Sequence, residues 1–348
     1  MKKSLRFVCF AALFLALLSL FTLLLMRKPA ASLAVSTDQN LGFYDEPENS
    51  IDVLYVGPSH AFCGISPLDI YHEYGITGYV RSTSLQKIWN SETVVRESLK
   101  YQKPKVLLLE VGMMYNILPH KEDWPNRELY DTMRPGLVKL GGVEAVVQRE
   151  PGETLISYIF PILRYHERWR ELDGADLSFL FQSRHMITKG FKPNLLVSPP
   201  VEPEEELYSL DTAPFEYDAS VEAYLSEIKS LCQSAGVELV LLKVPTQRRA
   251  YWDGSKHLAT VELADKLGVP FLDYNVDMRL DEEIDWDTET SDEGNHINYF
   301  GAMKFSHSLG KWLTESYSFD RPSDAVRESW DADYALYRAA MDAALAGR

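Results

Sequence analysis

The chain has little cysteine and no recognisable nucleotide-binding loop. Three cysteines in 348 residues cannot build a disulfide-rich scaffold or a cysteine-based zinc cluster. Cys63 and Cys232 could form one disulfide or remain two buried thiols, and the sequence leaves both open. Neither a Walker-type loop nor a Gly-x-Gly-x-x-Gly string occurs, and no pair of histidines has metal-ligand spacing. We therefore expect no soluble cofactor and no metal.

Positive charge is also scarce. The sequence has 35 Lys and Arg against 51 Asp and Glu, a formal net charge of −16. The first 28 residues carry five basic residues and no acidic ones, so the remainder carries −16 − 5 = −21. Because nucleic acid requires a basic face, this balance excludes nucleic acid as an expected partner. It also argues mildly against tight binding of a polyanionic polymer.

One long uncharged run stands at the start of the chain. Residues 7–26 contain no charged side chain and are long enough to span a bilayer. The hydrophobic region of a cleaved signal is usually only about 7–15 residues long. We therefore predict a cytoplasmic stub and uncleaved signal anchor in 1–28, a tether over 29–45, and a body outside the cytoplasm at the cell membrane. A small-residue stretch at 32–34 leaves secretion after cleavage as the alternative.

A candidate nucleophile follows the first buried strand. Residues 51–56 are mostly apolar β-formers, Gly57 and Pro58 stop the strand, and Ser59 comes next. In open α/β sheets ligands bind at the carboxyl ends of the strands. The Gly-x-Ser string is common, so by itself it is better explained as an ordinary strand-to-loop turn.

A second motif, DEGNHIN at 292–298, precedes the last helical pattern of the domain. A serine hydroxyl needs a base to take its proton, and an imidazole needs an acidic partner to fix its tautomer. His296 can be that base. Glu293 can supply the carboxylate, and Asp292 competes with it. The plainer interpretation is a helix entry with polar capping residues, but the two motifs together are more specific than either alone.

With GPSH at 57–60 and EGNHIN at 293–298, the chain resembles the SGNH/GDSL hydrolase superfamily. It is most similar to the membrane-tethered SGNH-like proteins of alginate O-acetylation and teichoic-acid D-alanylation. The resemblance implies Ser59 as nucleophile, His296 as general base and then acid, and Glu293, at the superfamily's three-residue offset, as the preferred orienting carboxylate. The superfamily's middle motifs, a Gly and a Gly-x-Asn-Asp, are not recognisable. Gln86, near the expected position of that glycine, is therefore the candidate second oxyanion donor beside the Ser59 amide.

The alternation of patterns predicts an α/β fold. Buried strand runs at 51–56, 105–111 and 237–244 alternate with amphipathic helices. We expect a three-layer α/β/α, flavodoxin-like SGNH hydrolase fold over 46–317, with a mostly parallel sheet of about five strands and an N-terminal transmembrane helix. Residues 318–348 form a helical tail whose apolar stripe should dock on the body.

The alternation breaks over 113–213, a proline-rich stretch that we interpret as an insertion capping the carboxyl edge of the sheet. Within it, Arg164, His166 and Arg168 stand beside aromatic residues. Aromatic rings stack on sugars and arginine binds carboxylates, so these three are candidate substrate-binding residues. The alternative is an ion-paired helix surface.

The resemblance implies acyl transfer, most simply of an acetyl group, through an acyl-Ser59 intermediate to a cell-surface glycan or envelope polymer. Two alternatives stay open. One is a carbohydrate esterase (a deacetylase) that uses the same residues and passes the acyl group to water. The other is a catalytically degenerate scaffold that partners a multi-span membrane acyltransferase.

Overall fold

The fold is built on five parallel strands, seen in a computed structural model. The strands are β1 (Val53–Gly57), β2 (Gly78–Ser82), β3 (Val106–Glu110), β4 (Glu238–Lys243) and β5 (Phe271–Asp273). Their order is β2-β1-β3-β4-β5, and every neighbouring pair is parallel. This is the flavodoxin-like order, so the predicted α/β class and strand number are confirmed. The structure describes residues 2–26, 39–181, 184–201, 207–278 and 280–347.

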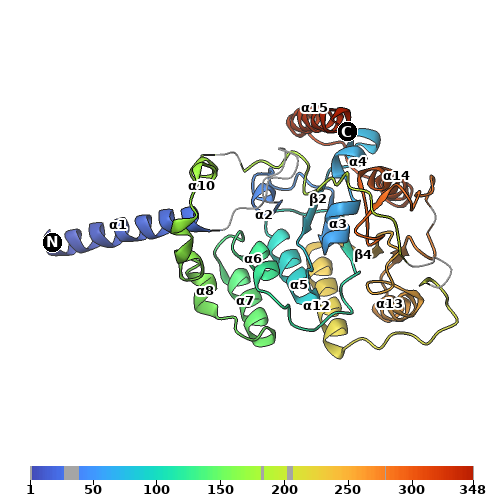
Figure 1. Cartoon of the computed structure of the whole chain (residues 1–348), viewed down its shortest axis with the longest axis horizontal. Coiled ribbons are helices and arrows are strands. Elements are labelled where there is room, and N and C mark those ends of the chain that lie inside the picture. Colours follow the sequence, from blue (N-terminus) through green and yellow to red (C-terminus); the bar gives the residue numbers. More distant parts are fainter. Residues whose placement is uncertain (1, 27–38, 182–183, 202–206, 279, 348) are drawn as a thin grey trace.

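Helices cover both faces of this sheet (Figure 1). Alternate residues of each strand point to opposite faces, and the apolar ones form two separate clusters. One cluster holds α5 (Ile88–Ser98) and α12 (Ala219–Ala235), with contributions from α13 (Gly254–Leu267). The other holds α3 (Ser59–Gly64), α4 (Pro67–Tyr74) and α14 (Tyr299–Ser316), the elements that surround the candidate nucleophile.

The two cysteines of the body lie on opposite sides of the sheet. Cys63 belongs to α3, and Cys232 belongs to α12. Both are free thiols, and burial raises the pKa of each to about 12. The disulfide that the sequence left open is therefore absent, because the sheet stands between its two candidate ends.

The insertion between β3 and α12 holds a series of short helices. It contains α6 (Trp124–Tyr130), α7 (Leu137–Arg149), α8 (Leu155–Ile159), α9 (Ile162–Tyr165), the 3-10 helix η1 (His166–Arg170) and α10 (Gly174–Phe179). α7 packs against α5 and so extends one helical layer sideways. The returning chain reaches the candidate site, where the Lys192 N–H donates to the Phe62 carbonyl. α7 and α8 lie beside the sheet (Figure 1), whereas α6 contacts the loop after β2, where the Glu128 carboxylate accepts a hydrogen bond from the Ser84 N–H. A cap over the carboxyl edge of the sheet therefore stays a prediction.

The two ends of the chain lie outside this sandwich. α1 (Lys2–Leu25) projects from the body and is long and apolar enough to cross a membrane (Figure 1). α2 (Gln39–Phe43) is buried, with the Phe43 ring edge-on to Tyr79 in the core. Residues 39–43 of the predicted tether thus pack with the body, and its part at 29–38 falls outside the described residues. The C-terminal helix α15 (Asp324–Ala346) docks on α4 through buried side chains, as predicted. These are Trp330, Tyr337 and Met341.

Candidate active site

Ser59 stands at the carboxyl end of β1, as the first residue of α3. The turn before it requires glycine, because a Cβ on Gly57 would lie 2.6 Å from the Cβ of Glu110 on β3. Ser82, at the end of β2, donates a hydrogen bond of 2.6 Å to the Pro58 carbonyl. The strands on both sides of β1 therefore fix the turn and hold the half-buried Ser59 at the edge of the sheet.

His296 reaches Ser59 from a small hairpin. β6 (Thr290–Ser291) pairs antiparallel with β7 (His296–Ile297), and α14 begins immediately afterwards with Asn298 as its N-cap. The His296 Nε2 lies 2.8 Å from the Ser59 Oγ. The structure thus brings two residues that are 237 positions apart into hydrogen-bond distance.

Asp292 is the carboxylate beside the imidazole. Its Oδ2 lies 3.3 Å from the His296 Nδ1 and accepts a hydrogen bond of 2.9 Å from the Asn295 side-chain amide. The hydrogen bonds from His296 and from Asn295 hold the pKa of Asp292 well below its usual range, so the carboxylate is charged at neutral pH. Ser59, His296 and Asp292 therefore have the connectivity of a nucleophile, a base and an orienting acid.

The prediction that Glu293 pairs with His296 is wrong. The Glu293 carboxylate forms an ion pair with Arg248, from the loop after β4. Ser291 is the ladder partner of His296, so the residue that opens the hairpin loop, Asp292, lies beside the imidazole. Asp292 and Glu293 both have φ near +55°, so the chain turns sharply between them and the next carboxylate is directed elsewhere.

Gly294 completes this loop, and we expect Gly294→Ala to disturb it. Its φ is +80°, and a Cβ there would lie 2.8 Å from the Pro200 side chain. The left-handed conformation alone costs a side-chain-bearing residue about 1–2 kcal/mol, and the clash would displace Asp292. Denaturant unfolding and turnover of the full chain should both show a loss. Gly141→Ala, on the open surface of α7, is the control and should have little effect. If Gly294→Ala has as little effect as the control, the loop tolerates a side chain at 294 and the prediction is wrong.

Gln86 makes its side-chain hydrogen bonds within its own loop. It is buried in the loop after β2, where its Oε1 accepts from the Thr83 N–H and hydroxyl and its Nε2 donates to the Ser91 hydroxyl. These bonds hold the amide in its own loop, which argues against Gln86 as the second oxyanion donor. The backbone N–H of Ser59, in the first turn of α3, remains the candidate donor.

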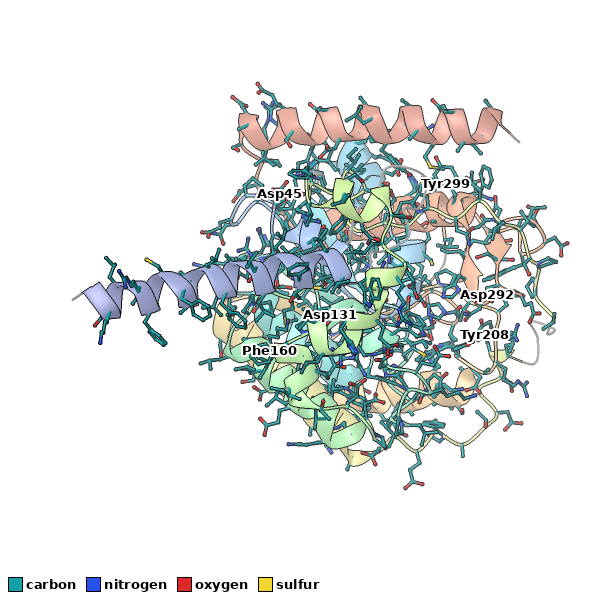
Figure 2. All side chains as sticks on the ribbon, turned by 60° about the vertical axis from the view of Figure 1, so that its left-hand side comes forward. Asp45, Asp131, Phe160, Tyr208, Asp292 and Tyr299 are labelled. Carbon is teal, nitrogen blue, oxygen red and sulfur yellow. The ribbon has the colours of Figure 1, made fainter. Side chains whose placement is uncertain are left out.

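The predicted substrate-binding cluster lies elsewhere. Arg164 pairs with Asp123 at 2.6 Å, His166 Nδ1 contacts the Leu163 carbonyl at 3.1 Å, and Arg168 donates to carbonyls at the end of α1. The hydroxyl of their neighbour Tyr165 donates a hydrogen bond to Asp131, and Figure 2 shows Asp131 far from Asp292. Arg164 and Arg168 are thus ion-paired, which agrees with the alternative for this stretch. Among the described residues, none of the three has a contact with the Ser59 site.

Sequence reasoning missed a buried ion pair beneath the nucleophile turn. Lys243 Nζ lies 2.8 Å from Glu110 Oε1, and both side chains are inaccessible to solvent. The signals were a lysine in the apolar run at 237–244 and a glutamate in the apolar run at 105–111. His60 forms a hydrogen bond of 3.0 Å with the Asn295 carbonyl, and its ring centre lies 4.7 Å from that of His296. Burial lowers the pKa of His60 well below its usual value, so it braces the hairpin as a neutral ring.

Among the described residues, no group of three His, Cys, Asp or Glu side chains is arranged to hold a metal ion.

Comparison with known proteins gives similarity at the level of overall shape only. No family model and no curated protein sequence matches the chain. A GDSL-like lipase from Bacteroides thetaiotaomicron aligns at 10% identity and a TM-score of 0.34, covering 76% of this chain and 88% of the lipase. A catalytic mutant of an acetylxylan esterase from Geobacillus stearothermophilus aligns at 12% identity and a TM-score of 0.34, covering 80% and 98%. These values are too low to transfer an activity, so the chemistry must be derived from this chain's own side chains.

Proposed function

We propose that the protein is an SGNH-type serine enzyme that forms an acyl ester on Ser59 and transfers the acyl group. The observation that carries the proposal is the distance of 2.8 Å between the Ser59 Oγ and the His296 Nε2, with Asp292 on the other side of the imidazole. A serine hydroxyl at a strand end, hydrogen-bonded to a histidine that a charged carboxylate orients, is the arrangement that nucleophilic acyl chemistry needs.

In the first half of the reaction, the His296 Nε2 takes the Ser59 proton while the Oγ attacks the carbonyl carbon of an ester. Asp292 keeps the other imidazole proton on Nδ1 and stabilises the imidazolium that forms. The Ser59 N–H is placed to stabilise the developing oxyanion. His296 then returns its proton to the leaving alcohol, and an acyl-Ser59 ester remains. In the second half an acceptor hydroxyl attacks that ester by the same steps in reverse.

We propose a cell-envelope glycan hydroxyl as the acceptor and an acetyl group as the acyl unit. Support comes from α1, a helix long and apolar enough for a single-pass anchor, which would hold the body outside the cytoplasm beside the membrane. There the site could receive acyl groups from a multi-span membrane acyltransferase, the partner we propose.

Hydrolysis is the second candidate, because the Asp292 side chain is 66% exposed. Water therefore has access to the hairpin beside the acyl-serine and could compete with the acceptor hydroxyl.

The test supplies an activated acetyl ester to the full chain, with and without envelope oligosaccharides, and measures acetylated glycan and free acetate by mass spectrometry. We expect slow acetate release alone and glycan acetylation when the right acceptor is present, because a positioned hydroxyl can reach effective concentrations on the order of 10⁵ M. If no glycan changes the rate of acetate release, and the protein removes acetyl groups from acetylated glycan, the protein is an esterase. No turnover of any ester, with glycan binding retained, would establish the scaffold.

A further inference from the structure

The short helices beside α1 expose an unusual share of the apolar side chains. Outside α1, eighteen large apolar side chains are exposed among the described residues, and nine of them fall within residues 155–181. This segment, which we name the apolar platform, contains α8, α9, η1 and α10. Such a concentration of exposed apolar surface marks an interaction site. The most exposed members are Ile156, Leu163, Trp169, Leu177 and Phe181.

The apolar platform is fixed to the end of α1. Arg168 donates hydrogen bonds of 2.8 Å and 2.7 Å to the carbonyls of Leu25 and Met26, and Asp176 holds its guanidinium at 3.2 Å. The last carbonyls of a helix have no partner within the helix, so Arg168 caps α1. α9, η1 and α10 contact this end of α1, whereas the rest of the helix projects away exposed (Figures 1 and 2). The apolar platform therefore surrounds the point where α1 meets the body.

We propose that the apolar platform inserts into the surface of a phospholipid bilayer, the membrane that α1 would cross, so that its side chains contact acyl chains at the headgroup boundary. The proposal rests on the proposed anchor. At about 1.5 Å per residue the 24 residues of α1 extend roughly 36 Å, slightly more than the ~30 Å hydrocarbon core. A spanning α1 thus places its capped end, and the apolar platform around it, at the bilayer surface.

Side-chain chemistry favours lipid chains rather than charged headgroups as the ligand. The apolar platform carries three arginines and four acidic residues, 3 − 4 = −1, so it has no net attraction for anionic lipid. Trp169, 63% exposed with the Arg170 guanidinium 5.2 Å from its ring centre, has the amphipathic character of residues that lie at membrane interfaces. Apolar burial must therefore supply the affinity, which should not depend on salt.

Bilayer contact beside α1 would give the body a second attachment. A single helix leaves the body free to rotate about the helix axis, whereas an inserted face of the body does not. The Ser59 edge of the sheet would then keep one orientation toward the membrane surface.

The experiment places an environment-sensitive fluorophore on single cysteines of the full chain in phosphatidylcholine proteoliposomes. Cys63→Ala and Cys232→Ala are present throughout, and Cys9→Ala is added wherever a new cysteine is introduced. Ile156→Cys and Leu177→Cys report on the apolar platform, at side chains 51% and 58% exposed. Leu336→Cys, on α15 and 56% exposed, is the matched control. Native Cys9, within α1, reports on the anchor.

We expect lipids with a nitroxide high on the acyl chain to quench both reporter positions about twofold or more, as for groups buried at the headgroup boundary, and to leave Leu336→Cys unquenched. Raising salt from about 0.1 M to about 1 M, which shortens the Debye length from about 10 Å to about 3 Å, should leave the quenching unchanged.

If nitroxides deep in the bilayer quench Cys9 but both reporter positions remain as unquenched as Leu336→Cys, the anchor stands and the bilayer contact is wrong; a protein would then be the partner of this face. An unquenched Cys9 overturns the anchor and the bilayer contact together. Ester turnover, measured on the same samples, separates either failure from a failure of the proposed chemistry.

Discussion

Ser59→Ala should abolish both labelling by a fluorophosphonate probe and turnover of an activated acetyl ester. The hydroxyl is the atom that would form the acyl ester, and its Oγ already lies 2.8 Å from the base His296. Loss of the nucleophile of a serine triad costs on the order of 10⁶-fold in kcat, so residual turnover should be close to background. Stability should change little, because the removed group is small and half-buried.

The control is Ser316→Ala, an exposed serine at the end of α14, which should label and turn over like the wild-type chain. Equal labelling of the wild-type chain and Ser59→Ala would show that the probe reacts elsewhere and would remove Ser59 as nucleophile. If Ser59→Ala loses labelling but the wild-type chain turns over no ester, Ser59 is a reactive serine and the proposed acyl transfer is wrong.

Asp292→Asn should reduce turnover severely, and Glu293→Gln should be mild. The amide at 292 would keep the side-chain shape but lose the charge that stabilises the imidazolium, and it could favour the wrong tautomer of His296. In a serine triad this change costs about 10⁴-fold in kcat. Because the Asp292 side chain is 66% exposed and water can partly replace it, we expect a loss on the order of 10² to 10⁴-fold.

Glu293→Gln is the matched control, one position along the same loop and also left-handed in φ. Its carboxylate is 53% exposed and pairs with Arg248, and exposed ion pairs contribute only about 0–1 kcal/mol. The measurement is kcat and KM for the activated ester at several pH values. A mild Asp292→Asn together with a damaging Glu293→Gln would reverse the assignment made from the geometry.

The sequence alone predicted the parallel sheet and the contact between Ser59 and His296. Strands that are buried on both faces have a continuous apolar pattern, and parallel topology puts every carboxyl end on one edge. A residue just after β1 and a residue just before α14 are therefore brought to the same edge without any knowledge of side-chain contacts.

Tertiary structure alone decided which groups point into the site. Asp292 rather than Glu293 meets His296 because of two left-handed φ angles and an arginine, Arg248, supplied by a distant loop. Gln86 was a reasonable candidate by position, but its hydrogen bonds to Thr83 and Ser91 could not be foreseen from spacing. In each case the direction of one side chain depends on partners remote in sequence, and no periodic pattern encodes such partners.

The same distinction applies to the ends of the chain and to the insertion. The uncharged run at 7–26 identified an apolar helix, because length and composition alone define one. Whether the arginines of this stretch face a sugar or the protein itself depends on how the insertion packs. The structure pairs Arg164 with Asp123 and places Arg168 at the end of α1. The pattern of apolar residues thus determined that the chain has an apolar anchor-like helix and a buried parallel sheet. Long-range packing determined which charged side chains meet, because ion pairs and hydrogen bonds depend on distance in space and not on distance in sequence.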